Sequence, residues 1–269
     1  MQPAAASPPR PTRNVFLTGA SSGIGAAFAR EFASRGATLG LAARRKPALD
    51  ELAASLPGSH RTYAVDITRH DDLIAAARDF DATSGGTDVV IANAGISVGV
   101  ITEYYEDLAA FRDVMETNVL AMAATFHPFI APMRDRGHGT LVGIASVAGI
   151  RGLPGSEAYC ASKSAAITYC ESLRVGLRKS GVKVVTLAPG FVRTPLTAKN
   201  PYRMPFLMEA ADFARHAVDA IEAQASYRVI PWQMGVVAKL LRALPNWAFD
   251  RLLGNRPRKP RKADTIYEP

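Results

Sequence analysis

Cysteine is scarce in this sequence: Cys160 and Cys170 are the only two among 269 residues. Both fall in one expected helix, where their spacing of ten positions corresponds to about 15 Å along the axis, beyond the reach of a disulfide. This scarcity excludes a disulfide-bonded scaffold and a cysteine-rich metal centre, so we expect no bound metal. We interpret both thiols as small, buried core side chains.

Long apolar runs are lacking as well, since no stretch reaches the roughly 20 residues that a membrane-spanning helix needs. Residues 1–12 are rich in proline and alanine and contain no apolar segment of the secretory type. We therefore expect a disordered leader at 1–12 and a cytoplasmic protein.

Acidic residues are fewer than basic ones, 24 against 32, which gives a net charge of +8 and a pI of about 9.7. Residues 255–269 form a basic tail, and without five of its cations the net charge falls to +3. Those cations are Arg256, Arg258, Lys259, Arg261 and Lys262. A tail without a groove-reading element gives only salt-sensitive, nonspecific attraction, so we expect no specific nucleic-acid partner.

Short apolar runs and helical patterns alternate along most of the chain. Strands are predicted at 15–18, 38–43, 61–65, 88–92, 139–145 and 182–187, and helices at 24–34, 47–56, 71–82, 108–134 and 156–180. Continuous Val, Ile and Leu in the strands indicate a parallel sheet with helices on both faces. The predicted fold class is α/β, a single Rossmann-like, doubly wound parallel sheet over residues 13–254.

A glycine-rich turn joins the first strand to the first helix. Its spacing, G-x-x-x-G-x-G, lets the backbone turn sharply and approach a pyrophosphate, while the helix offers free N–H groups and its positive dipole end. We expect the cofactor phosphates at Gly19, Ser21, Ser22, Gly23, Ile24 and Gly25.

Two arginines, Arg44 and Arg45, follow the second strand, and no acid stands at its end. An acid there would bind the ribose hydroxyls of NAD, whereas guanidinium groups suit a 2′-phosphate, so we predict NADP(H) in preference to NAD(H). Asp66 follows the third strand and is predicted to reach the adenine amine. The sequence Asn93-Ala94-Gly95 follows the fourth strand, at the sheet edge where ligands bind in such folds.

Tyr159 and Lys163 are separated by four positions, which places a phenol and an ammonium on one face of a helix. A nearby cation lowers the pKa of a phenol and brings it closer to the working pH, as acid/base catalysis requires. Ser146 follows the fifth strand, where its hydroxyl could hydrogen-bond a substrate oxygen. An amide at Asn118 could hold a water that links Lys163 to solvent.

Taken in order, these motifs resemble the short-chain dehydrogenase/reductase family over about residues 13–227. The resemblance rests on the turn from Thr18 to Gly25, Asn93-Ala94-Gly95, Asn118, Ser146, Tyr159, Lys163 and Pro189-Gly190, with Ser146 standing 13 residues before Tyr159. One departure is Ala92, where the family often has asparagine; we expect little consequence.

The resemblance implies a role for each matching residue. Tyr159 would be the general acid/base, Lys163 would hold the nicotinamide ribose, Ser146 would position the substrate oxygen, and Asn118 would sustain proton relay. Pro189, Gly190, Val192 and Thr194 would line the nicotinamide end of the cofactor. The resemblance also implies a homodimer or homotetramer.

The pattern loosens after Pro189. A lid is expected at about 194–208, a helix at 209–223, an edge strand at 228–230 and amphipathic helices at about 232–253. The lid is rich in apolar side chains, which favours an apolar substrate. Residues 232–262 combine both tryptophans with basic residues, and three interpretations stay open: a peripheral membrane contact, a cap over the substrate pocket, or a subunit contact.

The predicted function is that of an NADP(H)-dependent oxidoreductase interconverting a carbonyl and an alcohol on a small apolar substrate. A non-catalytic NADP-binding sensor or scaffold is the alternative, although such a protein would not need the set Asn118, Ser146, Tyr159 and Lys163. Membrane association is the alternative to a purely cytoplasmic location.

Overall fold

The computed structural model describes residues 14–261, apart from 199 and 256. The predicted leader at 1–12 and the end of the basic tail, with Arg256 and Lys262, lie outside the described residues. The part of the tail that is described, 257–261, packs against the body of the protein.

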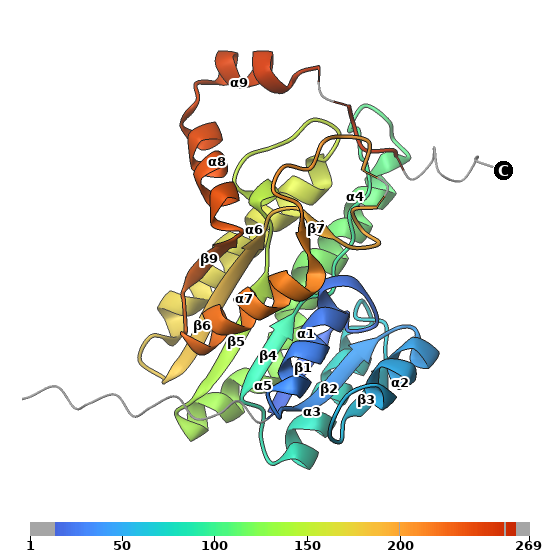
Figure 1. Ribbon diagram of the computed structural model, residues 1–269, viewed down its shortest axis with the longest axis vertical. Helices are drawn as coiled ribbons and strands as arrows, with labels where there is room; N and C mark the ends of the chain where they lie inside the picture. Colours follow the sequence, from blue (N-terminus) through green and yellow to red (C-terminus); the bar gives the residue numbers. More distant parts are fainter. Residues whose placement is uncertain (1–13, 199, 256, 262–269) are drawn as a thin grey trace, which may run out of the picture.

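The core of the protein is a sheet of seven parallel strands, as predicted (Figure 1). Its order is β3-β2-β1-β4-β5-β6-β9. The strands are β1 (Asn14–Thr18), β2 (Thr38–Ala43), β3 (Arg61–Ala64), β4 (Val89–Ala92), β5 (Gly139–Ile144), β6 (Val182–Pro189) and β9 (Tyr227–Ile230). The strand order reverses between β1 and β4, which opens a crevice for ligands at the carboxyl ends of these strands.

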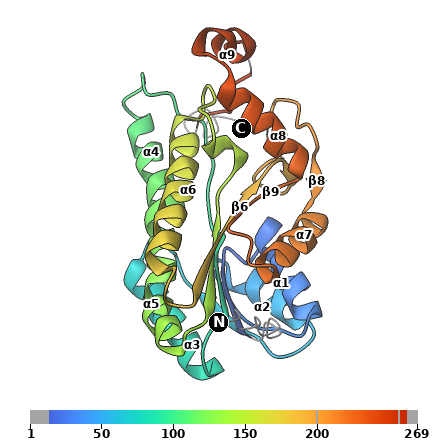
Figure 2. The same cartoon turned by 90° about the vertical axis from the view of Figure 1, so that its left-hand side faces the viewer.

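Helices cover both faces of the sheet, which Figure 2 shows nearly edge-on. One face carries α1 (Gly23–Ser34), α2 (Lys46–Ala54) and α7 (Ala210–Glu222), and the other carries α3 (His70–Ser84), α4 (Asp107–Met115), α5 (Ala121–Arg136) and α6 (Glu157–Leu177). Buried phenylalanines fill both layers: Phe28, Phe32 and Phe213 on the first, and Phe16, Phe80 and Phe129 on the second. Each such side chain stabilises the fold by about 2–3 kcal/mol through burial.

The long helix predicted at 108–134 is interrupted. Helices α4 and α5 are joined by a π-helical turn, η1 (Glu116–Leu120), which contains the buried Asn118. The wider turn departs from the 3.6-residue period, and such turns are frequent at functional sites. The predicted helix is thus helical from 107 to 136, and the π-helical turn within it is the feature that the helical pattern did not predict.

The remaining elements surround the carboxyl edge of the sheet. A short 3-10 turn, η2 (Val147–Gly149), follows β5, and a two-stranded ribbon of β7 (Val192–Arg193) and β8 (Met208–Glu209) brackets the segment expected to be a lid. Helices α8 (Trp232–Ala243) and α9 (Asn246–Leu253) lie beyond β9, close to the predicted bounds. Among the described residues, we find no helix with the length and apolarity needed to cross a membrane.

Candidate active site

Ser146 and Tyr159 meet at the carboxyl edge of the sheet. Ser146 directly follows β5, and its hydroxyl oxygen accepts a hydrogen bond from the Ala148 backbone N–H at 3.1 Å, which fixes the start of η2. Tyr159 lies in the first turn of α6, close enough to the Ser146 side chain for Ser146 to lower the pKa of its phenol. The two side chains that the sequence predicts around a substrate oxygen are therefore brought together.

Lys163 is buried one turn further along α6. Its ammonium donates a hydrogen bond to the Ile144 carbonyl at 2.8 Å and lies 5.8 Å from the centre of the Tyr159 ring. Burial lowers the pKa of Lys163 to about 8 and raises that of Tyr159 to about 12, although the Ser146 side chain opposes the second shift. The expectation that the nearby Lys163 lowers the pKa of the Tyr159 phenol is therefore wrong for these side chains, because burial outweighs the neighbouring charge. The effect of an oxidised nicotinamide on this pKa stays a prediction.

Asn118 joins the π-helical turn to the loop after β4. Its amide oxygen accepts from the Ile96 backbone N–H at 2.8 Å, and its Nδ2 donates to the Ile96 carbonyl and to the Ser162 hydroxyl, both at 3.0 Å. The Ser162 hydroxyl in turn donates to the Tyr159 carbonyl at 2.8 Å. The side chain thus ties helix α6 to the segment after Gly95, while the predicted water relay stays a prediction.

The glycine turn lies against the motif at 93–95. Asn93 donates from Nδ2 to the carbonyls of Thr18 and Gly19, at 3.0 and 3.3 Å, and the Thr18 hydroxyl accepts from the N–H groups of Asn93 and Ala94. A Cβ on Gly25 would lie 2.0 Å from the Gly19 carbonyl oxygen. Only glycine fits there, so the backbone forms a tight cradle at the start of α1.

The first turn of α1 has features that suit an anion. In the part of the chain that the structure describes, the Ser22 side chain does not cap its N-terminus, and no acidic residue lies in its first turn, so this helix end keeps its positive partial charge. Arg44 and Arg45 are exposed at the end of β2, and Arg45 donates to the Ser21 hydroxyl at 3.2 Å. The residues at this end of the crevice therefore fit a phosphorylated dinucleotide.

Asp66 lies close to this arginine pair. Its Oδ1 accepts from the N–H and the hydroxyl of Thr68, at 3.0 and 2.8 Å, and these bonds, aided by the charge of Arg44, hold the pKa of the carboxyl below its usual value. Asp66 is ionised at neutral pH, which suits an acceptor for an amine.

The four residues predicted to line the nicotinamide end follow β6. Pro189 ends that strand, and Gly190 is packed so closely under α8 that a Cβ would lie 2.7 Å from the Met234 side chain. Val192 is buried, and Thr194 faces the glycine turn, where a Cβ on Gly23 would lie 3.2 Å from its own Cβ. The segment predicted to line the nicotinamide therefore contacts the glycine turn predicted to bind the phosphates, at Thr194 and Gly23.

Sequence reasoning missed several residues that organise the site. Ser162 is one of them, since it is buried and its hydroxyl connects Asn118 to the Tyr159 carbonyl, a contact that the sequence alone gives no sign of. Arg151, between Ser146 and Tyr159, donates to the carbonyls of Leu241 and Leu244. Such a contact across 90 residues leaves no pattern in the sequence.

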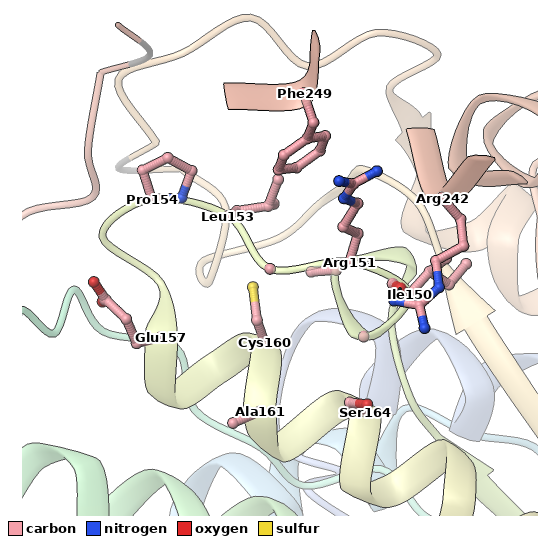
Figure 3. Close-up of a pocket in the computed structure, with 13 residues that line it drawn as sticks. Ile150, Arg151, Leu153, Pro154, Glu157, Cys160, Ala161, Ser164, Arg242 and Phe249 are labelled. Carbon is pink, nitrogen blue, oxygen red and sulfur yellow. Dashed lines mark hydrogen bonds between the residues drawn. The ribbon is translucent and has the colours of Figure 1, made fainter. Parts of the chain in front are cut away.

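A cavity of about 520 Å³ lies between the loop at 148–154 and one side of α6 (Figure 3). The loop at 148–154, the helix positions Glu157, Cys160, Ala161 and Ser164, and Arg242 and Phe249 from α8 and α9 line it. Neither Tyr159 nor Lys163 contributes, because they lie on the opposite face of the helix. The cavity is therefore separate from the candidate active site.

Comparisons with known proteins agree with this geometry. Residues 13–204 match the family described as short chain dehydrogenase. An uncharacterized oxidoreductase of Myxococcus xanthus is 40% identical over 244 residues, which cover 88% of this chain and 95% of that protein. An estradiol 17-beta-dehydrogenase 11 of Pongo abelii is 32% identical and is matched over 86% of this chain and 79% of its own. Among solved structures, a short-chain dehydrogenase of Sphingobium yanoikuyae in complex with NADPH has a TM-score of 0.75 at 26% identity, covering 91% of this chain and 96% of its own.

Proposed function

The chain belongs to the short-chain dehydrogenase/reductase family, and from that premise we propose that it is an NADP(H)-dependent oxidoreductase that interconverts a carbonyl and an alcohol on a small apolar substrate. The observation that carries the proposal is the position of the buried Lys163 ammonium, 5.8 Å from the centre of the Tyr159 ring, with the Ser146 side chain close enough to Tyr159 to lower the pKa of its phenol. This arrangement supports proton transfer at one oxygen atom of a substrate.

Each catalytic side chain has one task in this proposal. The Tyr159 hydroxyl donates its proton to the carbonyl oxygen during reduction and takes it back during oxidation. The Ser146 hydroxyl donates a hydrogen bond to the same oxygen and orients it, and Lys163 holds the ribose next to the nicotinamide. When bound, the dinucleotide supplies or accepts the hydride. Asn118 acts by positioning, since it fixes both Ile96 and α6.

The choice of NADP(H) rests on Arg44 and Arg45. Two exposed guanidinium groups at the end of β2 complement the 2′-phosphate. Gly19, Gly23 and Gly25 supply the backbone cradle for the pyrophosphate.

An apolar substrate is supported by the side chains of the lid. Leu196 and Phe206 are exposed by 40% and 51%, and Tyr202 packs on Phe191 with 6.3 Å between ring centres. The name of the Pongo abelii relative points to estradiol, an apolar steroid alcohol. We therefore favour an apolar ketone or aldehyde as substrate and reduction as the direction.

An equilibrium titration with NADPH and NADH tests the cofactor choice. We expect at least tenfold tighter binding of NADPH and a loss of this preference in Arg44→Ala, because a charge-assisted phosphate contact contributes about 1.5–3 kcal/mol. Arg78→Ala removes an exposed arginine of α3 and is the matched control. Equal affinities for the two nucleotides in the wild type would make the NADP(H) assignment wrong.

A panel of apolar ketones and aldehydes then tests catalysis, with Tyr159→Phe as the blank. Loss of reduction in the variant with unchanged NADPH affinity supports the acid/base assignment. Tight NADPH binding without turnover of any carbonyl would favour the sensor or scaffold instead.

We also propose that α8 and α9 make a peripheral contact with an anionic membrane. Trp232, Leu240 and Trp247 are 70%, 64% and 73% exposed, and Lys239 and Arg242 add positive charge beside them. The test is sedimentation with phosphatidylglycerol vesicles and with phosphatidylcholine vesicles. Binding to the anionic vesicles that is lost in Trp232→Ala/Trp247→Ala supports the contact, and equal sedimentation of wild type and double variant makes it wrong. A change of oligomeric state in the double variant would instead indicate the homodimer or homotetramer interface.

A further inference from the structure

The described end of the basic tail is a strap over the active-site edge of the protein. We call residues 257–261 the C-terminal strap; in Figure 1 the chain runs from α9 across the upper part of the molecule to the N-terminal end of α4. The Pro260 carbonyl accepts a hydrogen bond from the Gly99 N–H at 3.0 Å, and the Lys259 ammonium donates to the Ser97 hydroxyl at 3.0 Å. The strap therefore contacts the loop that begins directly after Gly95.

Arg261 anchors the strap. Its guanidinium donates to Asp107 at 2.9 Å and to Glu106 at 2.8 Å, and it lies 3.6 Å from the centre of the Tyr104 ring. Asp107 is 2% exposed, and its Oδ2 also accepts the Ile101 N–H at 2.8 Å. Arg261 thus neutralises a buried carboxylate that folds the loop at 101–107, and removing a partner from such a buried pair is strongly destabilising.

The strap also touches the second loop of the active-site edge. The Arg258 side chain packs on Gly155, where a Cβ would lie 2.7 Å from the Cβ of Arg258. Val100 and Ser156 form a β-bridge directly between the two loops. The strap therefore joins the loop after the cofactor motif to the loop that connects Ser146 with Tyr159.

We propose that Arg261 is a positioning residue that fixes the loop at 97–107 as one wall of the substrate entrance, a role that rests on the proposed reductase function. The wall has apolar side chains, since Ile96, Val98 and Val100 pack on the cluster of Ala110, Val114 and Ala158. A loop released from the strap must be ordered again when substrate binds, and that loss of conformational entropy weakens substrate binding.

The chemistry and the cofactor site have separate supports. Ser146, Tyr159 and Lys163 lie after β5 and in α6, and residues 93–96 are held by Thr18 and Asn118. Loss of the strap should therefore change the KM for the carbonyl and leave kcat and the affinity for NADPH nearly constant.

The first experiment compares steady-state kinetics of the wild type, Arg261→Ala and Arg261→Lys with the best carbonyl substrate at saturating NADPH. We expect a five- to tenfold higher KM in Arg261→Ala, kcat and the NADPH dissociation constant within twofold, and partial recovery of KM in Arg261→Lys, which keeps the charge. Arg251→Ala removes an exposed arginine of α9 and is the matched control. An unchanged KM in Arg261→Ala would overturn the proposal.

A second experiment measures the local stability of the loop at 97–107 and does not depend on enzyme activity. Amide hydrogen exchange should be at least tenfold faster at Gly99 and Ile101 in Arg261→Ala than in the wild type, with no change at Val142 in the sheet core. If exchange at Gly99 and Ile101 does not change, the strap does not hold the loop, whether or not the protein is a reductase. Faster exchange at Gly99 and Ile101 together with an unchanged KM would show that the strap holds the loop but that the loop does not contribute to substrate binding. Absence of any NADPH binding would instead refute the proposed function, and exchange would still decide whether the strap holds the loop.

Discussion

Replacing Arg151 by alanine should release α8 and α9 from the loop that connects Ser146 and Tyr159, the two side chains proposed to be catalytic. The guanidinium donates to the carbonyls of Leu241 and Leu244, the latter at 2.7 Å, and to the Asn246 side chain at 3.0 Å. It also lies 3.8 Å from the centre of the Phe249 ring. One side chain therefore satisfies the last carbonyls of α8 and packs on α9.

The magnitude follows from these contacts. Hydrogen bonds from a charged group contribute about 1.5–3 kcal/mol each, and a partly exposed cation–π contact adds about 0.5–1 kcal/mol. The contacts are not additive, because the released carbonyls gain water, so we take about 2 kcal/mol for the loss of docking. A loss of about 2 kcal/mol raises the equilibrium constant for opening of α8 and α9 roughly 30-fold.

Cys160 offers a direct assay of this opening. Its side chain lines the cavity that Phe249 and Arg242 cover, and burial raises the pKa of the thiol to about 11, so alkylation at pH 8 is slow in the closed state (Figure 3). Cys170 is 1% exposed in the core behind the sheet and reports global unfolding. We expect alkylation of Cys160 to be about 30-fold faster in Arg151→Ala than in the wild type, with Cys170 unchanged.

Two results would refute this reasoning. Equal acceleration at both cysteines would mean that Arg151 stabilises the whole fold and not the docking of α8 and α9. An unchanged rate at Cys160 would mean that the contacts of Arg151 add nothing to docking. Arg251→Ala, which removes an exposed arginine of α9, is the control and should leave both rates at the wild-type value.

Three further substitutions test the site. Gly25→Ala should weaken NADPH binding at least tenfold in titration while circular dichroism stays native, since the new Cβ would lie 2.0 Å from the Gly19 carbonyl oxygen; native affinity would exclude the cradle. Asn118→Ala should lower the free energy of unfolding in urea by about 2–4 kcal/mol, because it leaves two backbone groups of Ile96 without partners, and a loss below 1 kcal/mol would contradict this. Lys163→Met tests the lowered pKa of Lys163, about 8 in the folded protein: between about pH 8 and 10.4 the unfolded chain binds more protons at this group, so the wild type should gain up to about 3 kcal/mol of stability relative to the variant as pH rises. A pH-independent difference between the two proteins would show that the pKa is not lowered.

The sheet and its order of elements could be predicted because the inner strands are buried on both faces, whereas the edge strands β3 and β9 are partly exposed. A run such as Val89–Ala92 must then be continuously apolar, and the helices between such runs must return to the same edge. The pairing of Tyr159 with Lys163 could be predicted for a similar reason, since a spacing of four places both on one helix face. Ser146 could be placed next to this pair because the end of β5 and the start of α6 lie at the same carboxyl edge of the sheet.

Other features depend on contacts between distant residues. The π-helical turn forms around the hydrogen bonds of Asn118 with Ile96 and Ser162, which lie 22 and 44 residues away in the chain. The strap depends on the pair Arg261 and Asp107, 154 residues apart. Neither contact produces a periodic pattern, so the sequence predicted a basic tail and not its place on the protein.

The two arginine contacts divide the site into a part set by local sequence and a part set by distant contacts. The proposed cofactor and proton chemistry lies at the glycine turn, the ends of β4 and β5 and the first turns of α6, whose positions along the chain the sequence motifs identify. The walls of the substrate entrance are loops with little regular structure of their own, and Arg151 and Arg261 connect them to residues 241–261. Substitutions in that C-terminal segment should therefore change which carbonyls are accepted before they change the hydride and proton steps.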